Sequence, residues 1–393
     1  MQSMFDISPV QWFLLEASLL LLLVAFAAFL ARVLPLRRHA DRDADPLQPL
    51  EPETFSKCAV VVYSKDEAGE LNELLPQILG QDYPEDFEVI VVNEGESASV
   101  SEVVGDFQIA HKNLYLTNTP DGARNLSRKK LAITLGIKAT RMPVVVLTSA
   151  GCRIGSPLWL RAMMRHFSHD ATTEVVLGFA AAPPYDDKAM GARARSFDFV
   201  ADSAAWVSPA ISGHPWRGTE HNLAYTRELF FRNKGFSRHL NLRNGDDDIF
   251  ISEIANGDNT AVELSPDGLV EVPGALSPRA FRDEKARRSF TSRFIRRRPR
   301  VVGGLGFTCY FLVPLLAIAA GLVTPRNWVP WAAAGVVVAL WYAVGLVWHF
   351  AVASLHGRRL FLTIPFLAFS RPIRKLRRGL RSIFSHSKRY TWE

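Results

Sequence analysis

Three adjacent aspartates, Asp246, Asp247 and Asp248, follow Gly245 in the second half of the chain. Neighbouring carboxylates repel each other, so this cluster indicates proton transfer or cation binding more readily than a contribution to stability. An apolar stretch, 249–251, follows directly, and acidic residues are also favourable at a helix N-terminus. Capping of a helix is therefore the alternative to proton transfer or cation binding for these residues.

Three consecutive cations, Arg128, Lys129 and Lys130, follow Ser127 at the predicted start of another helix. Cations at a helix N-terminus oppose the helix dipole, which favours a role in phosphate binding over one in stability. A solvated basic turn is the alternative for this group.

The elements that must position these residues alternate between strands and helices. Short apolar, β-branched runs predict strands, and periodic leucines and isoleucines predict helices. The predicted strands are 58–63, 87–92, 114–116 and 144–147, and the predicted helices are 66–79, 129–139 and 159–167. Such alternation predicts an open α/β sheet whose ligands bind beyond the carboxyl ends of the strands. Polar residues follow three of the strands there, beginning at Ser64, Asn93 and Thr148.

Three hydrophobic runs flank this region. About 20 apolar residues cross a bilayer core, and residues 12–35, 301–323 and 328–350 satisfy that length. Basic residues crowd one side of each run, at 37–38, 296–298 and 358–359. The positive-inside rule then predicts a multi-pass protein of the inner (plasma) membrane, with the main domain and the C-terminus in the cytoplasm.

The remaining segments complete this plan. Residues 1–11 are predicted to be periplasmic, 36–56 a linker, and 351–393 an interfacial segment followed by a basic tail that favours anionic membrane lipid. Charges in the soluble region are mixed, which argues against a nucleic-acid partner. Three cysteines in 393 residues form neither a disulfide framework nor a zinc spacing.

Six motifs in order resemble those of membrane-anchored family 2 glycosyltransferases with a GT-A fold. They lie at 61–68, 81–84, 87–93, 127–130, 218–225 and 245–248. The resemblance covers about residues 57–300 and implies an α/β, nucleotide-diphospho-sugar transferase-like mixed sheet domain with one N-terminal and two C-terminal transmembrane helices.

That resemblance implies an inverting transfer of sugar from a nucleotide-diphosphate donor to a lipid-linked or polysaccharide acceptor. Asp247 would be the base that deprotonates the acceptor hydroxyl, with Asp246 and Asp248 as neighbours that tune it. The residues implied around the nucleotide are Ser64, Asp66, Glu67, Glu94, Arg128, Lys129 and Lys130. Those implied to contact donor or acceptor are His221, Asn222, Arg287 and Arg288.

The chain also departs from the family pattern. The fourth strand usually ends in Asp-x-Asp, which holds Mg²⁺ or Mn²⁺ across the diphosphate, whereas this chain has Ser149, Ala150 and Gly151. A metal cofactor is therefore doubtful, and protein cations could replace its charge. Another alternative is a catalytically impaired subunit that binds nucleotide or a partner protein without turnover. A third, a channel-forming polysaccharide synthase, would need an oligomer or partner because three spans are too few for a pore.

Overall fold

The computed structural model describes residues 7–43, 55–120, 126–169, 172–183, 191–295 and 298–384. Parts of several predictions lie outside these residues: most of the linker, Arg296 and Arg297, the first six residues, and the end of the basic tail with Lys388 and Arg389. The chain divides into two compact units. One contains 1–37, 186–208 and 297–386, and the other contains 38–185, 209–296 and 387–393.

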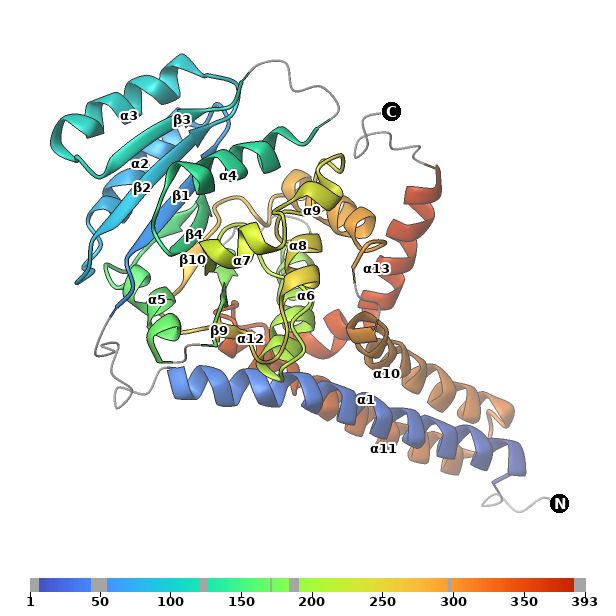
Figure 1. Cartoon of the computed structure of the whole chain (residues 1–393). Helices are drawn as coiled ribbons and strands as arrows, with labels where there is room; N and C mark the ends of the chain where they lie inside the picture. Colours follow the sequence, from blue (N-terminus) through green and yellow to red (C-terminus); the bar gives the residue numbers. More distant parts are fainter. Residues whose placement is uncertain are drawn as a thin grey trace. The chain divides into compact units, whose positions relative to one another are not determined.

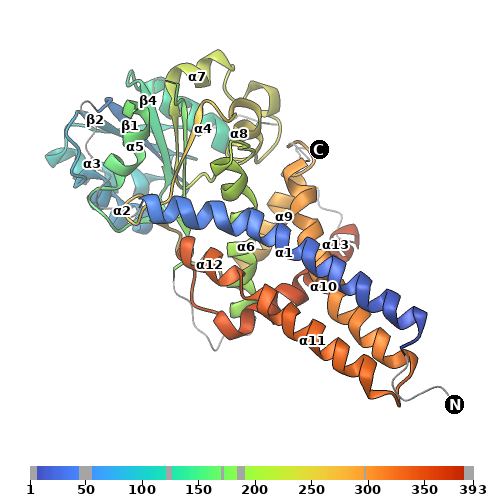
Figure 2. The same ribbon diagram turned by 90° about the horizontal axis from the view of Figure 1, so that it is seen from below.

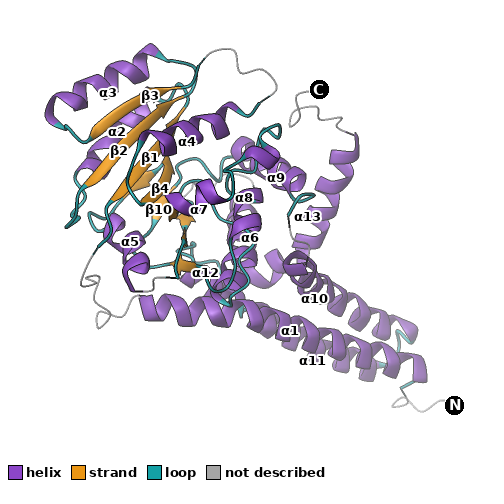
Figure 3. Cartoon of the chain, viewed as in Figure 1, coloured by secondary structure: helices purple, strands orange, loops and turns teal. Residues whose placement is uncertain are grey.

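A seven-stranded sheet forms the centre of the second unit (Figures 1 and 3). Its strand order is β3-β2-β1-β4-β8-β6-β9. The strands are β1 (Cys58–Ser64), β2 (Phe87–Asn93), β3 (Leu114–Asn118), β4 (Val144–Ser149), β6 (Val175–Gly178), β8 (Leu223–Thr226) and β9 (Thr260–Glu263). The first four are parallel, while β8 runs antiparallel to both β4 and β6. The sheet is therefore mixed, and the predicted strands are present.

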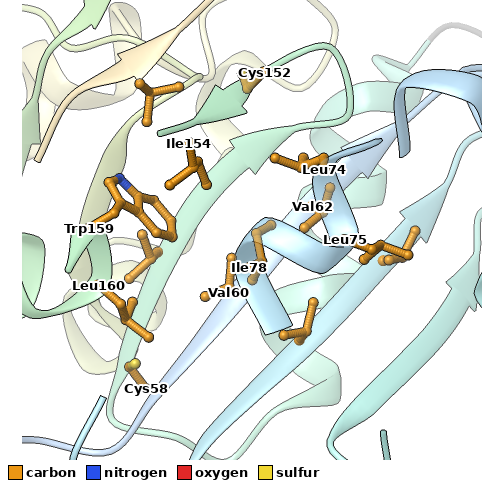
Figure 4. Close-up of a cluster of buried hydrophobic side chains, with 14 of the residues drawn as sticks. Cys58, Val60, Val62, Leu74, Leu75, Ile78, Cys152, Ile154, Trp159 and Leu160 are labelled. Atoms are coloured by element: carbon orange, nitrogen blue, oxygen red, sulfur yellow. The ribbon is translucent and has the colours of Figure 1, made fainter. Parts of the chain in front are cut away.

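Helices cover both faces of this sheet. Side chains alternate between faces along a strand, so Cys58, Val60 and Val62 of β1 join a buried cluster with α2 (Ala68–Leu79) and α5 (Trp159–His169) (Figure 4). Val61 faces the other way, toward α4 (Arg128–Ala139), where a Cβ on Gly136 would come within 2.6 Å of Val61 Cγ1. The close approach of helix and sheet at Gly136 requires glycine.

Shorter elements complete this unit. They are α3 (Ala98–Ala110), α7 (Arg227–Arg232), the 3₁₀ turn η1 (Ser237–His239), α8 (Ile249–Ile254), α9 (Pro278–Thr291) and a small sheet of β5 (Arg153–Ile154), β10 (Val270–Glu271) and β7 (Ala180–Ala181). The register of the main sheet pairs Ser64 with Asn93 and Tyr63 with Ser149. The polar residues that end β1, β2 and β4 therefore meet at one edge.

The first unit contains the hydrophobic helices (Figure 2). Its elements are most of α1 (Pro9–Asp43), α10 (Arg298–Val323), α11 (Trp328–Gly345), α12 (Trp348–Ser354), η2 (Phe361–Thr363) and α13 (Ile364–Phe384), together with most of α6 (Ala192–Ile211). Three stretches of the described chain are long and apolar enough to cross a membrane: Pro9–Asp43, Gly304–Val323 and Trp328–Ser354. The predicted fold class, a mixed α/β sheet domain with one N-terminal and two C-terminal hydrophobic helices, is confirmed.

Aromatic packing holds the hydrophobic helices together. Phe29 of α1 lies 5.2 Å from Phe307 of α10 and 5.5 Å from Trp348 of α12, between ring centroids. At the other end of α1, Gln11 Nε2 donates to Ala320 O at 3.0 Å. The three hydrophobic segments therefore form one packed bundle.

Three arginines of the basic tail form ion pairs with helix α6 of the same chain. Arg374 and Arg378 of α13 contact Asp198 of α6 at 2.9 and 3.0 Å, and Arg371 contacts it at 3.4 Å. Asp198 is 1% exposed. On the opposite side of α13, Ile373, Leu376 and Leu380 are exposed. The helix thus turns three arginines toward α6 and an apolar stripe outward.

Candidate active site

The aspartate triplet lies at the start of α8. Gly245 precedes it with φ +111°, a conformation that side-chain-bearing residues rarely adopt. Asp248 Oδ1 accepts a hydrogen bond from Ile249 N at 2.8 Å, and Oδ2 accepts one from the Thr291 hydroxyl of α9. Burial and the charge of Asp247 raise the pKa of Asp248. The helix-cap alternative therefore describes Asp248, and its role as a tuning neighbour stays a prediction.

Asp247 forms a two-pronged ion pair with α9. Arg287 Nη1 and Nη2 lie 3.3 and 3.4 Å from its two carboxylate oxygens, and Arg287 also binds Glu284 at 2.8 Å. The backbone carbonyl of Asp247 accepts from Gly218 N at 3.2 Å. Asp247 is thus anchored at its backbone, and its carboxylate is paired with the guanidinium of Arg287.

Asp246 faces the strand ends. Its Oδ2 lies 3.0 Å from Lys129 Nζ, and Lys129 also contacts Glu220. The same ammonium lies 5.4 Å from the ring centroid of Tyr63, the residue before the last of β1. Burial alone would raise the pKa of Asp246, but the charges of Lys129 and Arg287 lower it. Lys129 therefore joins the triplet to the carboxyl edge of the sheet.

The nucleotide-side residues gather at that edge. The Tyr63 hydroxyl donates to Glu94 Oε2 at 2.5 Å, and Lys65 Nζ donates to Glu94 Oε1 at 2.7 Å. Ser64 is fully buried, and its hydroxyl has no hydrogen-bond partner among the described residues. Asp66 is exposed with φ +54°, and Glu67 is half-buried at the N-cap of α2.

The three cations at the start of α4 have different surroundings. Lys130 is fully buried and donates to the carbonyls of His239, Leu242 and Asn244 at 2.7, 3.1 and 2.8 Å. Burial lowers the pKa of Lys130 to about 8. Its ammonium is saturated by the loop before the triplet, whereas Arg128 and Lys129 are partly exposed.

A hydroxyl, a thiol and an imidazole meet after β4. His221 Nδ1 lies 2.8 Å from Ser149 Oγ and 3.4 Å from Cys152 Sγ. Burial alone would raise the pKa of Cys152, but the charge and hydrogen bond of His221 lower it to about 7. Sequence reasoning predicted His221 and Ser149 separately and missed Cys152, because no Cys-to-His spacing in the chain indicates their contact.

Asn222 and Arg288, the remaining predicted contact residues, both have protein partners. Asn222 is fully buried: its Nδ2 donates to Phe179 O at 3.0 Å and its Oδ1 accepts from Trp159 Nε1 at 3.1 Å. Arg288 binds Glu284. Arg217, which sequence reasoning missed, lies 3.4 Å from Glu284, and burial lowers its pKa to about 10.

No protein-family model and no curated protein matches the chain. Among solved structures, a mannosyltransferase from Pyrobaculum calidifontis, solved with GDP-Man and Mn²⁺, is 20% identical; the match covers 91% of this chain and 99% of that one, with TM-score 0.49. TarS of S. aureus (residues 1–349) is 14% identical, with coverage of 81% and 91% and TM-score 0.40. Glucosyl-3-phosphoglycerate synthase of Mycobacterium tuberculosis, solved with Mn²⁺ and UDP, is 14% identical, with coverage of 59% and 80% and TM-score 0.35.

Proposed function

We propose that this protein is a membrane-bound inverting glycosyltransferase. It transfers a sugar from a nucleotide-diphosphate donor to a lipid-linked or polysaccharide acceptor at the cytoplasmic face of the inner membrane. The observation that carries the proposal is the contact of Lys129 with both Asp246 and the Tyr63 ring. It brings the triplet to the sheet edge where an α/β fold binds ligands.

In the proposed reaction Asp247 accepts the proton of the acceptor hydroxyl. The acceptor oxygen attacks the anomeric carbon from the face opposite the leaving group. The bond between that carbon and the phosphate oxygen breaks, and the nucleoside diphosphate leaves with the electron pair. Asp246, which is paired with Lys129, and Asp248, which caps α8, flank the base. Around the nucleotide lie Ser64, Asp66, Glu67, Glu94, Arg128 and Lys129, while Lys130 holds the loop before α8.

The test is turnover by the full-length protein in lipid nanodiscs. With a panel of nucleotide sugars and native lipid extract, at least one donor should be consumed, and Asp247→Asn should lower the rate by at least about a hundredfold, the lower range of a general base's contribution. Asp106→Asn makes the same change at an exposed position of α3 and should leave the rate unchanged. Thermal unfolding of both variants checks that the fold is kept.

The second candidate is a catalytically impaired subunit that binds nucleotide or a partner protein. The observation in its favour is Ser149, Ala150 and Gly151 after β4, where the family has its carboxylates. A cellular function that tolerates Asp247→Asn, together with stable co-purification of another protein, would favour this candidate. No consumption of any donor would weigh against the transferase.

A further inference from the structure

The residues that end β4 do not fit a hard divalent cation. Mg²⁺ and Mn²⁺ prefer oxygen ligands, carboxylates above all. Here Ser149 Oγ is engaged by His221 at 2.8 Å and lies 3.2 Å from Cys152 Sγ, and Gly151 has no side chain. Within the described parts of the chain, no group of three or more His, Cys, Asp or Glu is arranged to hold a metal ion.

The carboxylates of the triplet's two ion pairs and of Glu220 and Glu284 already have protein cations as partners. Lys129 pairs with Asp246 and Glu220, and Arg287 pairs with Asp247 at 3.3 Å. Glu284 binds Arg287 at 2.8 Å, and the charges of Arg287 and Arg288 hold its pKa well below the ordinary value despite burial. A metal ion would have to displace these cations from buried ion pairs, which is costly.

The cation is the more exposed member of both pairs on the triplet. The Lys129 side chain is 19% exposed against 3% for Asp246, and the Arg287 side chain is 14% exposed against 1% for Asp247. An anionic ligand that approaches this edge of the sheet therefore meets the two cations before the carboxylates. Lys and Arg at such positions bind phosphate by charge-assisted hydrogen bonds.

We propose that this chain binds the diphosphate of its nucleotide without a divalent cation, because Lys129 and Arg287 supply the positive charge. The inference rests on the proposed function for the identity of the donor.

Calorimetric titration of the full-length protein tests the metal requirement. UDP, GDP and ADP serve as probes, each with EDTA and each with Mn²⁺ or Mg²⁺. At least one probe should bind in EDTA, with a Kd within about threefold of its value with metal. Binding that needs the metal, or no binding of any probe under either condition, would overturn the inference.

Substitutions of Lys129 and Arg287 test whether these two side chains supply the positive charge that binds the diphosphate. Lys129→Gln and Arg287→Gln should each raise the Kd of the nucleoside diphosphate at least about tenfold, as expected for a lost charge-assisted hydrogen bond. The Kd of the corresponding nucleoside, which has no phosphate, should stay unchanged, and this separates phosphate contact from loss of fold. Lys129→Arg and Arg287→Lys should recover most of the affinity. Arg232→Gln removes an exposed cation at the opposite edge of the sheet and serves as the matched control.

Two results separate this inference from the proposed function. Metal-free binding without any sugar transfer would keep the inference and count against the transferase. Transfer that stops in EDTA and resumes with Mn²⁺ would keep the transferase and overturn the inference. Diphosphate affinities of Lys129→Gln and Arg287→Gln equal to that of the natural sequence would also overturn it.

Discussion

Individual residues in this site differ mainly in what they touch. Asp246, Asp247 and Asp248 are consecutive and almost fully buried, yet one meets a lysine, one an arginine and one a backbone amide. The adjacent Lys129 and Lys130 also have different surroundings, because Lys129 is partly exposed and Lys130 is buried. Residue type alone therefore does not assign the roles, because neighbouring side chains point in different directions.

Among single residues, we predict that the thiol of Cys152 is unusually acidic. Because the pKa of Cys152 is lowered to about 7 by His221, its thiolate should predominate above that pH. The rate of alkylation of Cys152, followed by mass spectrometry, should rise with pH with a midpoint near 7, although burial makes it slow. His221→Gln should move the midpoint upward.

Cys58 provides an internal control for this measurement. Burial raises the pKa of its thiol, so it should stay unreactive over the same pH range. A Cys152 midpoint at or above about 8.5, the ordinary thiol value, would contradict the proposed thiol–imidazole interaction.

At the scale of elements, buried ion pairs connect helix α5 to strand β9. Glu263 of β9 accepts from Arg165 Nε at 2.9 Å and lies 2.8 Å from His166 Nε2 of α5. Burial alone would raise the pKa of Glu263, but His166 and Arg165 lower it to about 2, from an ordinary value of 4.5. Because the carboxylate is fully buried, this shift contributes to the stability of the folded state.

The sign of the pH dependence follows from the lowered pKa of Glu263. Its contribution, about 3 kcal/mol from the size of the shift, should be complete above pH 4.5 and should be lost as the pH falls toward 2. Glu263→Gln should therefore lower the free energy of unfolding at neutral pH by about that amount, measured by denaturant titration. Glu228→Gln, at an 84% exposed side chain, should change it by less than about 0.5 kcal/mol.

An unfolding free energy for Glu263→Gln that matches the natural sequence at pH 7 would contradict this account. The expected difference between the two proteins should also shrink below pH 4. Both observations concern the second unit, so a probe within that unit, such as the fluorescence of Trp159, is the suitable readout.

For the whole molecule, the spans and their flanking charges predict one orientation. Residue 326, in the turn between α10 and α11, should lie outside the cytoplasm, and residue 112, exposed after α3, should lie inside. In intact cells a membrane-impermeant thiol reagent should label Arg326→Cys but not Lys112→Cys. Permeabilised cells should show labelling of both. Labelling of Lys112→Cys in intact cells would reverse the proposed topology.

The sequence by itself determined the class of the fold and part of its elements. Apolar runs and helical periodicity predict the strands β1 to β4, the helices α2, α4 and α5 and the hydrophobic segments, because burial and membrane insertion require these patterns locally. Helix α3 and the antiparallel β8 are among the elements that were not predicted. The helix has a weak amphipathic pattern, and the direction of a strand depends on the neighbours that it pairs with.

Only the tertiary structure decided which candidate side chains share a site. It separated Lys130, which holds the loop before α8, from Lys129, which reaches Asp246, although the two are adjacent in sequence. It also paired Cys152 with His221 and Asp247 with Arg287 across 69 and 40 residues. Such partners are set by the approach of distant elements and by the desolvation of their charges, neither of which leaves a local pattern in the sequence.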